Sequence, residues 1–162
     1  MRLLLIALTL TFGSCLHNTI EISLKSTDPI ELVEFVKDFE SYKPNRYWDY
    51  QQWSIGYGCK AKKGERTISL SNAKLRLGVE LEKSRQEVIT FRNKHGYEWA
   101  PNQIDALTSF HFNIGTLRGL TNNGKRDDAE IAAMLPQYRK AGGEDVRGLV
   151  KRRKAEREYF QR

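Results

Sequence analysis

Hydrophobic residues recur three and four positions apart in several segments, which is the spacing of one face of an α-helix. The first such segment opens with Asp28 as a good N-cap and Pro29 as a good first helical residue. Its apolar positions are Leu32, Val33, Val36 and Phe39. Because proline disfavours helical geometry in the residues before it, this helix should end before Pro44, with Glu40 on its last turn.

Four further segments share the helical spacing, and each is bounded by a capping or helix-breaking residue. We expect a long helix from Ser69 or Ser71 to positions 93–96, a helix from Pro101 to Gly115, and helices over 127–135 and 148–160 that flank a Gly142–Gly143 turn.

The pattern between positions 47 and 70 alternates instead with a period of two, as in a half-buried strand. Trp53, Ile55, Tyr57 and Cys59 occupy every second position, with glycines between the last three. We expect a small antiparallel hairpin that turns within 61–65. The sequence therefore predicts class α+β, a mostly helical domain with one β-hairpin near its N-terminus.

Residues 1–16 have the anatomy of a secretory signal, with a positive start, an apolar run and small residues before Cys15. The apolar run is about half of the ~20 residues that a membrane-spanning helix needs. We expect export to the periplasm or the exterior, with 17–27 as a tether and 28–162 as the domain. A buried first helix, a lipidated Cys15 and transient membrane association through a retained leader stay open.

Composition narrows the range of partners. Lys and Arg number 27 against 20 Asp and Glu, a net charge of +7, which favours anionic polymers such as nucleic acid, membrane surfaces or cell wall. Two cysteines exclude a disulfide-dense scaffold, and the three histidines lack ligand spacing. We therefore expect no metal and no cofactor.

Glu40 and Asp49 are nine residues apart, on either side of a chain turn that could set two carboxylates on opposite walls of a groove. Glycosidic cleavage uses such a pair, one acid to protonate the leaving oxygen and one carboxylate to activate water. The neighbouring Phe39 would disfavour a charged carboxylate, so Glu40 is the better acid. Roughly two to three pairs of acids at any fixed separation are expected by chance, so context must discriminate.

The context resembles the phage-type lysozymes, the endolysins of glycoside hydrolase type. ESYKPNRYWDYQQWSIGYG at 40–58 is similar to their motif of Glu, Asp about nine residues later and Thr-Ile-Gly-Tyr-Gly. Positions 102–115 and 142–160 resemble the family's central and C-terminal helices, so the likeness covers roughly 30–161. It implies a lysozyme-like fold and a monomeric, cofactor-free enzyme that hydrolyses the bond between N-acetylmuramic acid and N-acetylglucosamine in bacterial peptidoglycan, for host cell lysis.

The resemblance also implies site residues. Glu40 is the proton donor, Asp49 its ionised partner in an inverting arrangement, and Ser54 stands where the family's water-positioning Thr sits. Gly58 is a place where the sugar chain approaches the backbone closely, and Phe112 is expected at the sugar groove, with core packing as its alternative.

The sequence departs from the family pattern at three places. Ser41 follows the acid where the family has Gly, the interval from Asp49 to Ser54 is one residue shorter, and Cys59 stands where many relatives have His. The shorter interval from Asp49 to Ser54 puts in question how the site would hold the attacking water. Cys15 and Cys59 together could form a thiol switch, with a half-buried thiol on a strand as the alternative.

Other functions remain open. A lytic transglycosylase would not need Asp49, a degenerate lysozyme fold could bind peptidoglycan without cutting it, and a nucleic-acid-binding protein would conflict with the leader. Positions 147–162 hold seven Lys or Arg and two Glu. This basic stretch could be a solvated face, attract wall polymers, or bring Arg152 or Arg153 to the groove beside Glu40.

Overall fold

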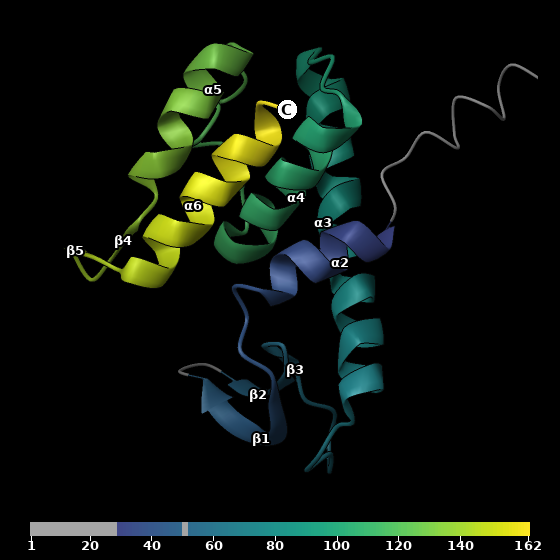
Figure 1. Ribbon diagram of the computed structural model, residues 1–162. Helices are drawn as coiled ribbons and strands as arrows, with labels where there is room; N and C mark the ends of the chain where they lie inside the picture. Colours follow the sequence, from purple (N-terminus) through teal and green to yellow (C-terminus); the bar gives the residue numbers. More distant parts are fainter. Residues whose placement is uncertain (1–28, 50–51) are drawn as a thin grey trace, which may run out of the picture.

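The computed structural model describes residues 29–49 and 52–162, which form a helical lobe and a smaller lobe built on a β-sheet (Figure 1). The helices are α2 (Pro29–Lys37), α3 (Leu70–His95), α4 (Pro101–Ile114), α5 (Asp128–Met134), the 3₁₀ turn η1 (Leu135–Gln137) and α6 (Arg147–Phe160). The strands are β1 (Lys43–Asp49), β2 (Gln52–Gly56), β3 (Cys59–Lys60), β4 (Lys140–Ala141) and β5 (Glu144–Asp145).

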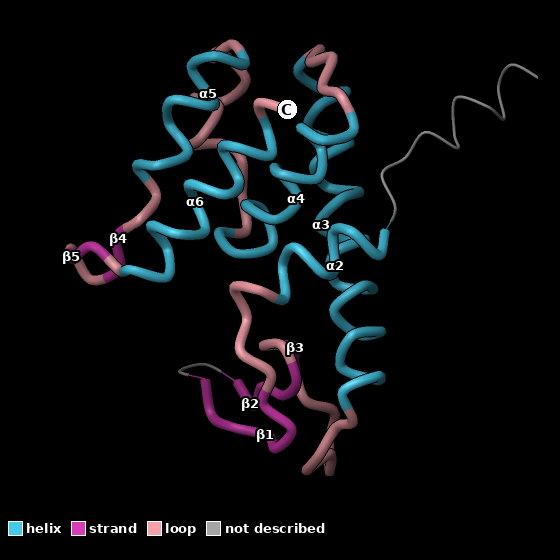
Figure 2. The backbone as a smooth tube through the Cα atoms, viewed as in Figure 1, coloured by secondary structure: helices cyan, strands magenta, loops and turns pink. Residues whose placement is uncertain are grey.

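Helix α3 joins the two lobes, running from the sheet to the far end of the helical lobe (Figure 2). Ser69 caps its start by accepting a hydrogen bond from the Asn72 amide at 3.3 Å, and Gly96 ends it with φ of 73°. These are the predicted boundaries. The cap chosen is Ser69 rather than Ser71.

Two hydrophobic cores pack against α3. The core of the sheet lobe unites α2, the sheet and the first half of α3, where Ala73, Leu77 and Leu81 are buried. The other core joins the second half of α3 to α4, α5 and α6, with Phe110 at 0% exposure. Phe35 of α2 packs against both cores. Both lobes are therefore anchored on one continuous helix.

The sheet has three antiparallel strands in the order β1-β2-β3. The prediction that the hairpin turns within 61–65 was wrong, because the chain already reverses between β2 and β3 at Tyr57–Gly58, where Gly58 has φ of 78°. A turn does form at Lys63–Gly64, but it lies beyond the sheet. It returns the chain to β1 through a bridge between Thr67 and Asn45.

Helix α2 also ends earlier than predicted, at Lys37. The amides of Phe39 and Glu40 donate to carbonyls three residues back, at 3.0 and 3.2 Å, so the chain tightens into a turn. Glu40 thus stands beyond the helix rather than on its last turn. The predicted N-cap, Asp28, lies outside the described residues.

The C-terminal region confirms the predicted helices and adds a small hairpin. Strands β4 and β5 pair on either side of Gly142–Gly143, whose φ angles of 61° and 89° suit a two-residue hairpin turn. The predicted class α+β, mostly helical with a small antiparallel sheet lobe, is confirmed. The short strands were not predicted, because two residues are too few to show an alternating pattern.

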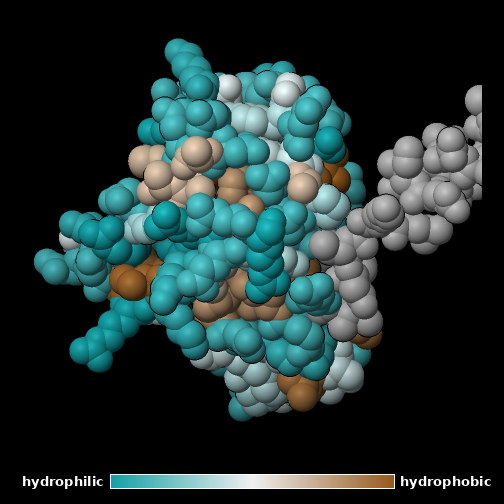
Figure 3. Space-filling model, turned by 45° about the horizontal axis from the view of Figure 1, so that its top comes forward, coloured by the Kyte–Doolittle hydropathy of each residue, from teal (hydrophilic) through white to brown (hydrophobic). Residues whose placement is uncertain are grey.

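Hydrophilic side chains dominate the face of the molecule seen in Figure 3, where hydrophobic residues form small, separate patches. None of the helices in the described part of the chain is both long and apolar enough to span a membrane.

Gly56 and Gly64 provide a matched test of packing in the sheet lobe. Both have positive φ, 67° and 80°, so alanine should cost about 1–2 kcal/mol of backbone strain at either position. A Cβ on Gly56 would also stand 3.0 Å from the Ala73 Cβ, whereas nothing lies within 4 Å at Gly64. We expect Gly56→Ala to lower the urea-unfolding free energy by at least about 1 kcal/mol more than Gly64→Ala. Equal losses would show that α3 yields freely to the added methyl group.

Candidate active site

A cavity of about 610 Å³ lies where the sheet lobe meets α3 and the C-terminal end of α4. Four of the five residues that the sequence predicted for the site line it, namely Glu40, Asp49, Gly58 and Phe112. Segments from positions 40 to 113 therefore converge on one space. Among its other lining residues are Tyr47, Gln52, Cys59, Glu80, Lys83 and Asn113.

Ser54 is the predicted residue that does not line this cavity. It is fully buried on β2 and faces Tyr47 across the β1–β2 ladder, so both side chains lie on the same side of the sheet. Its Oγ makes no hydrogen bond to another described residue. The water-positioning role of Ser54 stays a prediction.

Arg152 holds the Glu40 carboxylate. Its Nη1 donates to Glu40 Oε1 at 2.6 Å, and its side chain is only 3% exposed, against 24% for that of Glu40. The guanidinium also lies 5.6 Å from the centre of the Phe39 ring. The sequence predicted an apolar environment from Phe39 and left open an arginine beside Glu40, and the structure provides this buried cation. One carboxylate oxygen is thus fixed by charge-assisted hydrogen bonding.

The second oxygen of Glu40 faces the turn between β2 and β3. Glu40 Oε2 and the Tyr47 hydroxyl each lie 4.0 Å from the point where a Cβ on Gly58 would stand. A side chain at position 58 would enter the space between these two groups. The glycine thus keeps the cavity open beside the Glu40 carboxyl.

Tyr47 is a lining residue that the sequence did not predict. Burial raises the pKa of its phenol, and the negative charges of Asp49 and Glu40 raise it further, so both carboxyl groups act on the same hydroxyl. Lys43 lies 3.9 Å from the centre of its ring. The period of two along β1, which puts positions 47 and 49 on one side, was the available signal.

Glu156 of α6 holds Arg152 in place. Its Oε1 accepts from Arg152 Nε at 3.0 Å and from the Ser109 hydroxyl at 2.7 Å. The Ser109 carbonyl accepts from Arg152 Nη2 at 3.0 Å. Glu156 on α6 and Ser109 on α4 therefore hold this guanidinium, and Glu40 is its partner in the cavity.

Arg153 completes the buried charge cluster. Its Nη1 lies 2.7 Å from Glu156 Oε2, and its Nη2 donates to Asn113, which lines the cavity. Burial raises the pKa of Glu156 against the opposing influence of both guanidinium groups, and burial lowers the pKa of Arg153 to about 10. Of the two arginines that the sequence left open, Arg152 is the one that bonds to Glu40.

Cys59 lines the same cavity, yet its side chain is buried at 6% exposure. Burial raises the pKa of its thiol to about 11, with the Glu80 charge adding to the effect. The other cysteine of the predicted thiol switch, Cys15, lies outside the described residues, so the switch stays a prediction.

The raised pKa predicts low reactivity for Cys59. In a Cys15→Ser background at pH 8, we expect iodoacetamide to alkylate Cys59 about 100-fold more slowly in the folded protein than in urea, because the thiolate is the reactive form. The rate in the folded protein should climb until the pH approaches 11. Mass spectrometry measures the rate of alkylation. Fast alkylation of the folded protein at pH 8 would contradict the predicted low reactivity of Cys59.

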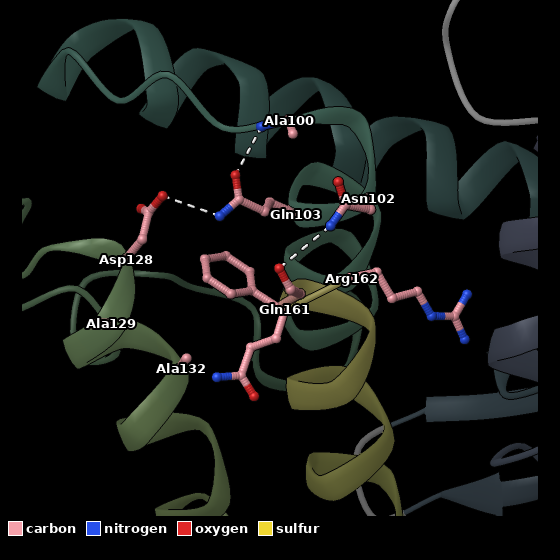
Figure 4. Close-up of a pocket in the computed structure, with 9 residues that line it drawn as sticks. Ala100, Asn102, Gln103, Asp128, Ala129, Ala132, Gln161 and Arg162 are labelled. Atoms are coloured by element: carbon pink, nitrogen blue, oxygen red, sulfur yellow. Dashed lines mark hydrogen bonds between the residues drawn. The ribbon is translucent and has the colours of Figure 1, made fainter.

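A second cavity, of about 410 Å³, lies at the far end of the helical lobe (Figure 4). Its acid, Asp128, accepts hydrogen bonds from Trp99 and Gln103, both at 3.0 Å, and Gln103 also accepts from the Ala100 amide. These contacts cap and join helices. Among the described residues, no group of three or more His, Cys, Asp and Glu could hold a metal ion.

Comparison with known proteins gives consistent findings. A family model described as phage lysozyme matches residues 37–156. Endolysins of Lactococcus phages c2 and phivML3 are 28% identical to the chain over 132 residues, which are 79% of this chain and 57% of each endolysin. The chain thus spans little more than half the length of these relatives.

Solved structures show the same fold. The muramidase domain of SpmX from Asticaccaulis excentricus is 26% identical, with a TM-score of 0.70 over 85% of this chain and 98% of that one. The active form of the P1 phage endolysin Lyz is 19% identical, with a TM-score of 0.64 over 88% and 89% of the two chains. At that identity the second likeness shows the fold alone.

Proposed function

The chain belongs to the phage lysozyme family and has its lysozyme-like fold, and from that premise we propose that it hydrolyses the β-1,4 bond between N-acetylmuramic acid and N-acetylglucosamine in bacterial peptidoglycan. The observation that carries the proposal is the pairing of Glu40 with buried Arg152 in a cavity that Asp49 also lines. Glycosidic cleavage uses two carboxyl groups that flank the scissile bond, and this cavity supplies two.

Glu40 is the proposed proton donor. Its Oε1 accepts from Arg152, which leaves Oε2 to carry the proton on the side of Gly58. That proton passes to the glycosidic oxygen as the bond from this oxygen to the sugar C1 breaks. A sugar chain seated against Gly58 and Phe112 would bring the scissile oxygen to Oε2.

Asp49 is the proposed base. It accepts a proton from the water that attacks C1, so that a hydroxyl group is added to one sugar and a proton to the other. Ser54 lies on the neighbouring strand, on the same side of the sheet, and its proposed role in positioning that water requires the water to reach its buried hydroxyl. This assignment gives inversion at C1, because the attacking water and the leaving oxygen occupy opposite faces of the sugar ring.

The biological role that fits this chemistry is lysis of a bacterial host by a monomeric, exported endolysin. The names of the Lactococcus phage relatives support it, and the basic composition suits an anionic wall polymer. The proposed leader at 1–16, its lipidation at Cys15 and any membrane association fall outside the described residues.

Digestion of purified insoluble peptidoglycan by the full chain tests the proposal, with loss of turbidity and mass spectrometry of the released sugars as readouts. Hydrolysis predicts products with ordinary reducing ends. Anhydromuramic ends would identify a transglycosylase instead. Folded protein that sediments with peptidoglycan but releases no sugar would identify a binding module, with the shortened interval from Asp49 to Ser54 as the place to look.

A further inference from the structure

The outer side of the sheet exposes two tryptophans. Trp48 and Trp53 are direct partners across the β1–β2 ladder, with side chains on the side away from Tyr47 and Asp49. Their rings meet edge to face at 5.6 Å, and they are 58% and 46% exposed. Large apolar groups this open to water cost free energy unless something covers them.

Stabilisation of the hairpin does not account for this exposure. A cross-strand aromatic pair contributes about 0.2–1 kcal/mol, and it can do so with smaller rings or with rings packed under a loop. Here a cation joins the pair, since the Arg46 guanidinium lies 4.7 Å from the centre of the Trp53 ring. Arg46 makes no salt bridge to any residue in the described ranges. Tryptophan and arginine are the residue types that most often dominate binding surfaces.

We propose that Trp48, Trp53 and Arg46 form a second glycan-binding site, the outer aromatic site, which holds a peptidoglycan strand on the back of the sheet whose front lines the cleft. The ligand class rests on the proposed function. Sugar rings would stack on the indole faces, and Arg46 would bind the carboxylates that peptidoglycan strands carry. The sheet segment suits an anionic polymer, because positions 43–67 hold six Lys or Arg against two acids.

A lipid surface fits this site less well. Membrane-inserting surfaces combine tryptophan with exposed aliphatic side chains, and the described residues of β1 and β2 expose none. The exposed aliphatic residues nearest in sequence, Leu70, Leu75 and Val79, lie on α3. A polymer with repeating rings and carboxylates matches both the aromatic pair and its cation.

A protein that binds one polymer at two sites holds it far more tightly than it would through either site alone. The outer aromatic site would therefore raise affinity for insoluble wall without changing the chemistry in the cleft. We expect Trp48→Ala with Trp53→Ala to weaken sedimentation with purified peptidoglycan at least tenfold, measured in a Glu40→Gln background so that no strand is cut. Arg46→Gln should weaken it several-fold, and more at low ionic strength than at high.

Leu75→Ala with Val79→Ala is the control, because it removes exposed apolar surface from α3, outside the proposed site, and should leave binding unchanged. With Glu40 present, the tryptophan variant should cleave a short soluble muropeptide tetrasaccharide at the unmodified rate. Undiminished binding to peptidoglycan would overturn the proposal, as would loss of binding only to phosphatidylglycerol vesicles, which would identify a lipid surface.

Thermal unfolding checks that each variant is folded, and the single change Trp48→Ala replaces the pair if the double variant is not. Binding that depends on the tryptophans in a chain that cleaves nothing would sink the proposed hydrolysis and leave the outer aromatic site standing. If the tryptophan variant bound peptidoglycan as tightly as the native chain and the native chain cleaved it, the outer aromatic site would be excluded and the proposed hydrolysis would stand.

Discussion

Glu40→Gln should lower the rate of peptidoglycan hydrolysis about 10²–10⁴-fold, the range that a positioned general acid contributes. Glutamine keeps the shape of the side chain, and its amide oxygen can still accept from Arg152 Nη1, 2.6 Å away in the native protein. What the amide lacks is a transferable proton on the side of Gly58. The measurement is the initial rate of turbidity loss, with reducing ends counted in parallel.

Glu34→Gln is the control for this change. Glu34 is a carboxyl on α2 that pairs with Lys37 and Lys74 outside the cavity, and hydrogen bonds from those lysines lower its pKa. We expect activity within twofold of the native protein. If Glu40→Gln kept a rate within threefold of native while remaining folded, Glu40 would not be the proton donor, and the assignment of the two acids would have to be reversed or abandoned.

Glu156→Gln should lower the free energy of unfolding by about 3–5 kcal/mol, because it leaves two buried guanidinium groups without their shared counter-charge. Arg152 and Arg153 are 3% and 0% exposed, so water cannot replace the lost carboxylate. For a chain of this length we expect the melting temperature to fall by about 6–20 °C. Calorimetry at neutral pH measures the fall.

Glu158→Gln is the matched control on the same helix. Its partner Lys154 is 3.8 Å away, and both side chains are mostly exposed, so the effect should stay within about 0.5 kcal/mol. Because burial raises the pKa of Glu156, equal stability of the two variants would mean that Glu156 is already protonated in the native protein. The Arg152 guanidinium would then depend on Ser109 and Glu40 instead.

The helices could be predicted because residues close in sequence determine where each helix begins and ends. Ser69, Gly96, Pro101 and Gly115 cap or break helices through contacts within a few residues, and all four boundaries were predicted correctly. The sheet was less predictable. Tyr57 continues the alternation of β2, but the positive φ angles of Gly56 and Gly58 end the strand and turn the chain, and periodicity alone does not show that these glycines take that conformation.

Some site residues could likewise be predicted from nearby sequence, whereas others depend on how distant elements pack. Glu40, Asp49 and Gly58 belong to one short motif and meet in one cavity, so the order of residues predicted their convergence. Arg152 was one of several open interpretations, because its meeting with Glu40 depends on how α6 packs on α4. Trp48 and Trp53 fit the alternation of the sheet, but their exposure depends on where the other described elements pack, which a pattern does not show.

The ion pair between Glu40 and Arg152 joins positions 112 residues apart. During synthesis the chain emerges from its N-terminus, so the sheet lobe and Glu40 leave the ribosome well before α6 does. Contacts of such long range close late, because most of the intervening chain must already be ordered. A nascent chain stopped before position 147 would carry both acids without the cation that orients one of them. If the proposed hydrolysis is correct, competence to cut wall polymer would therefore arrive only with α6, the last described helix.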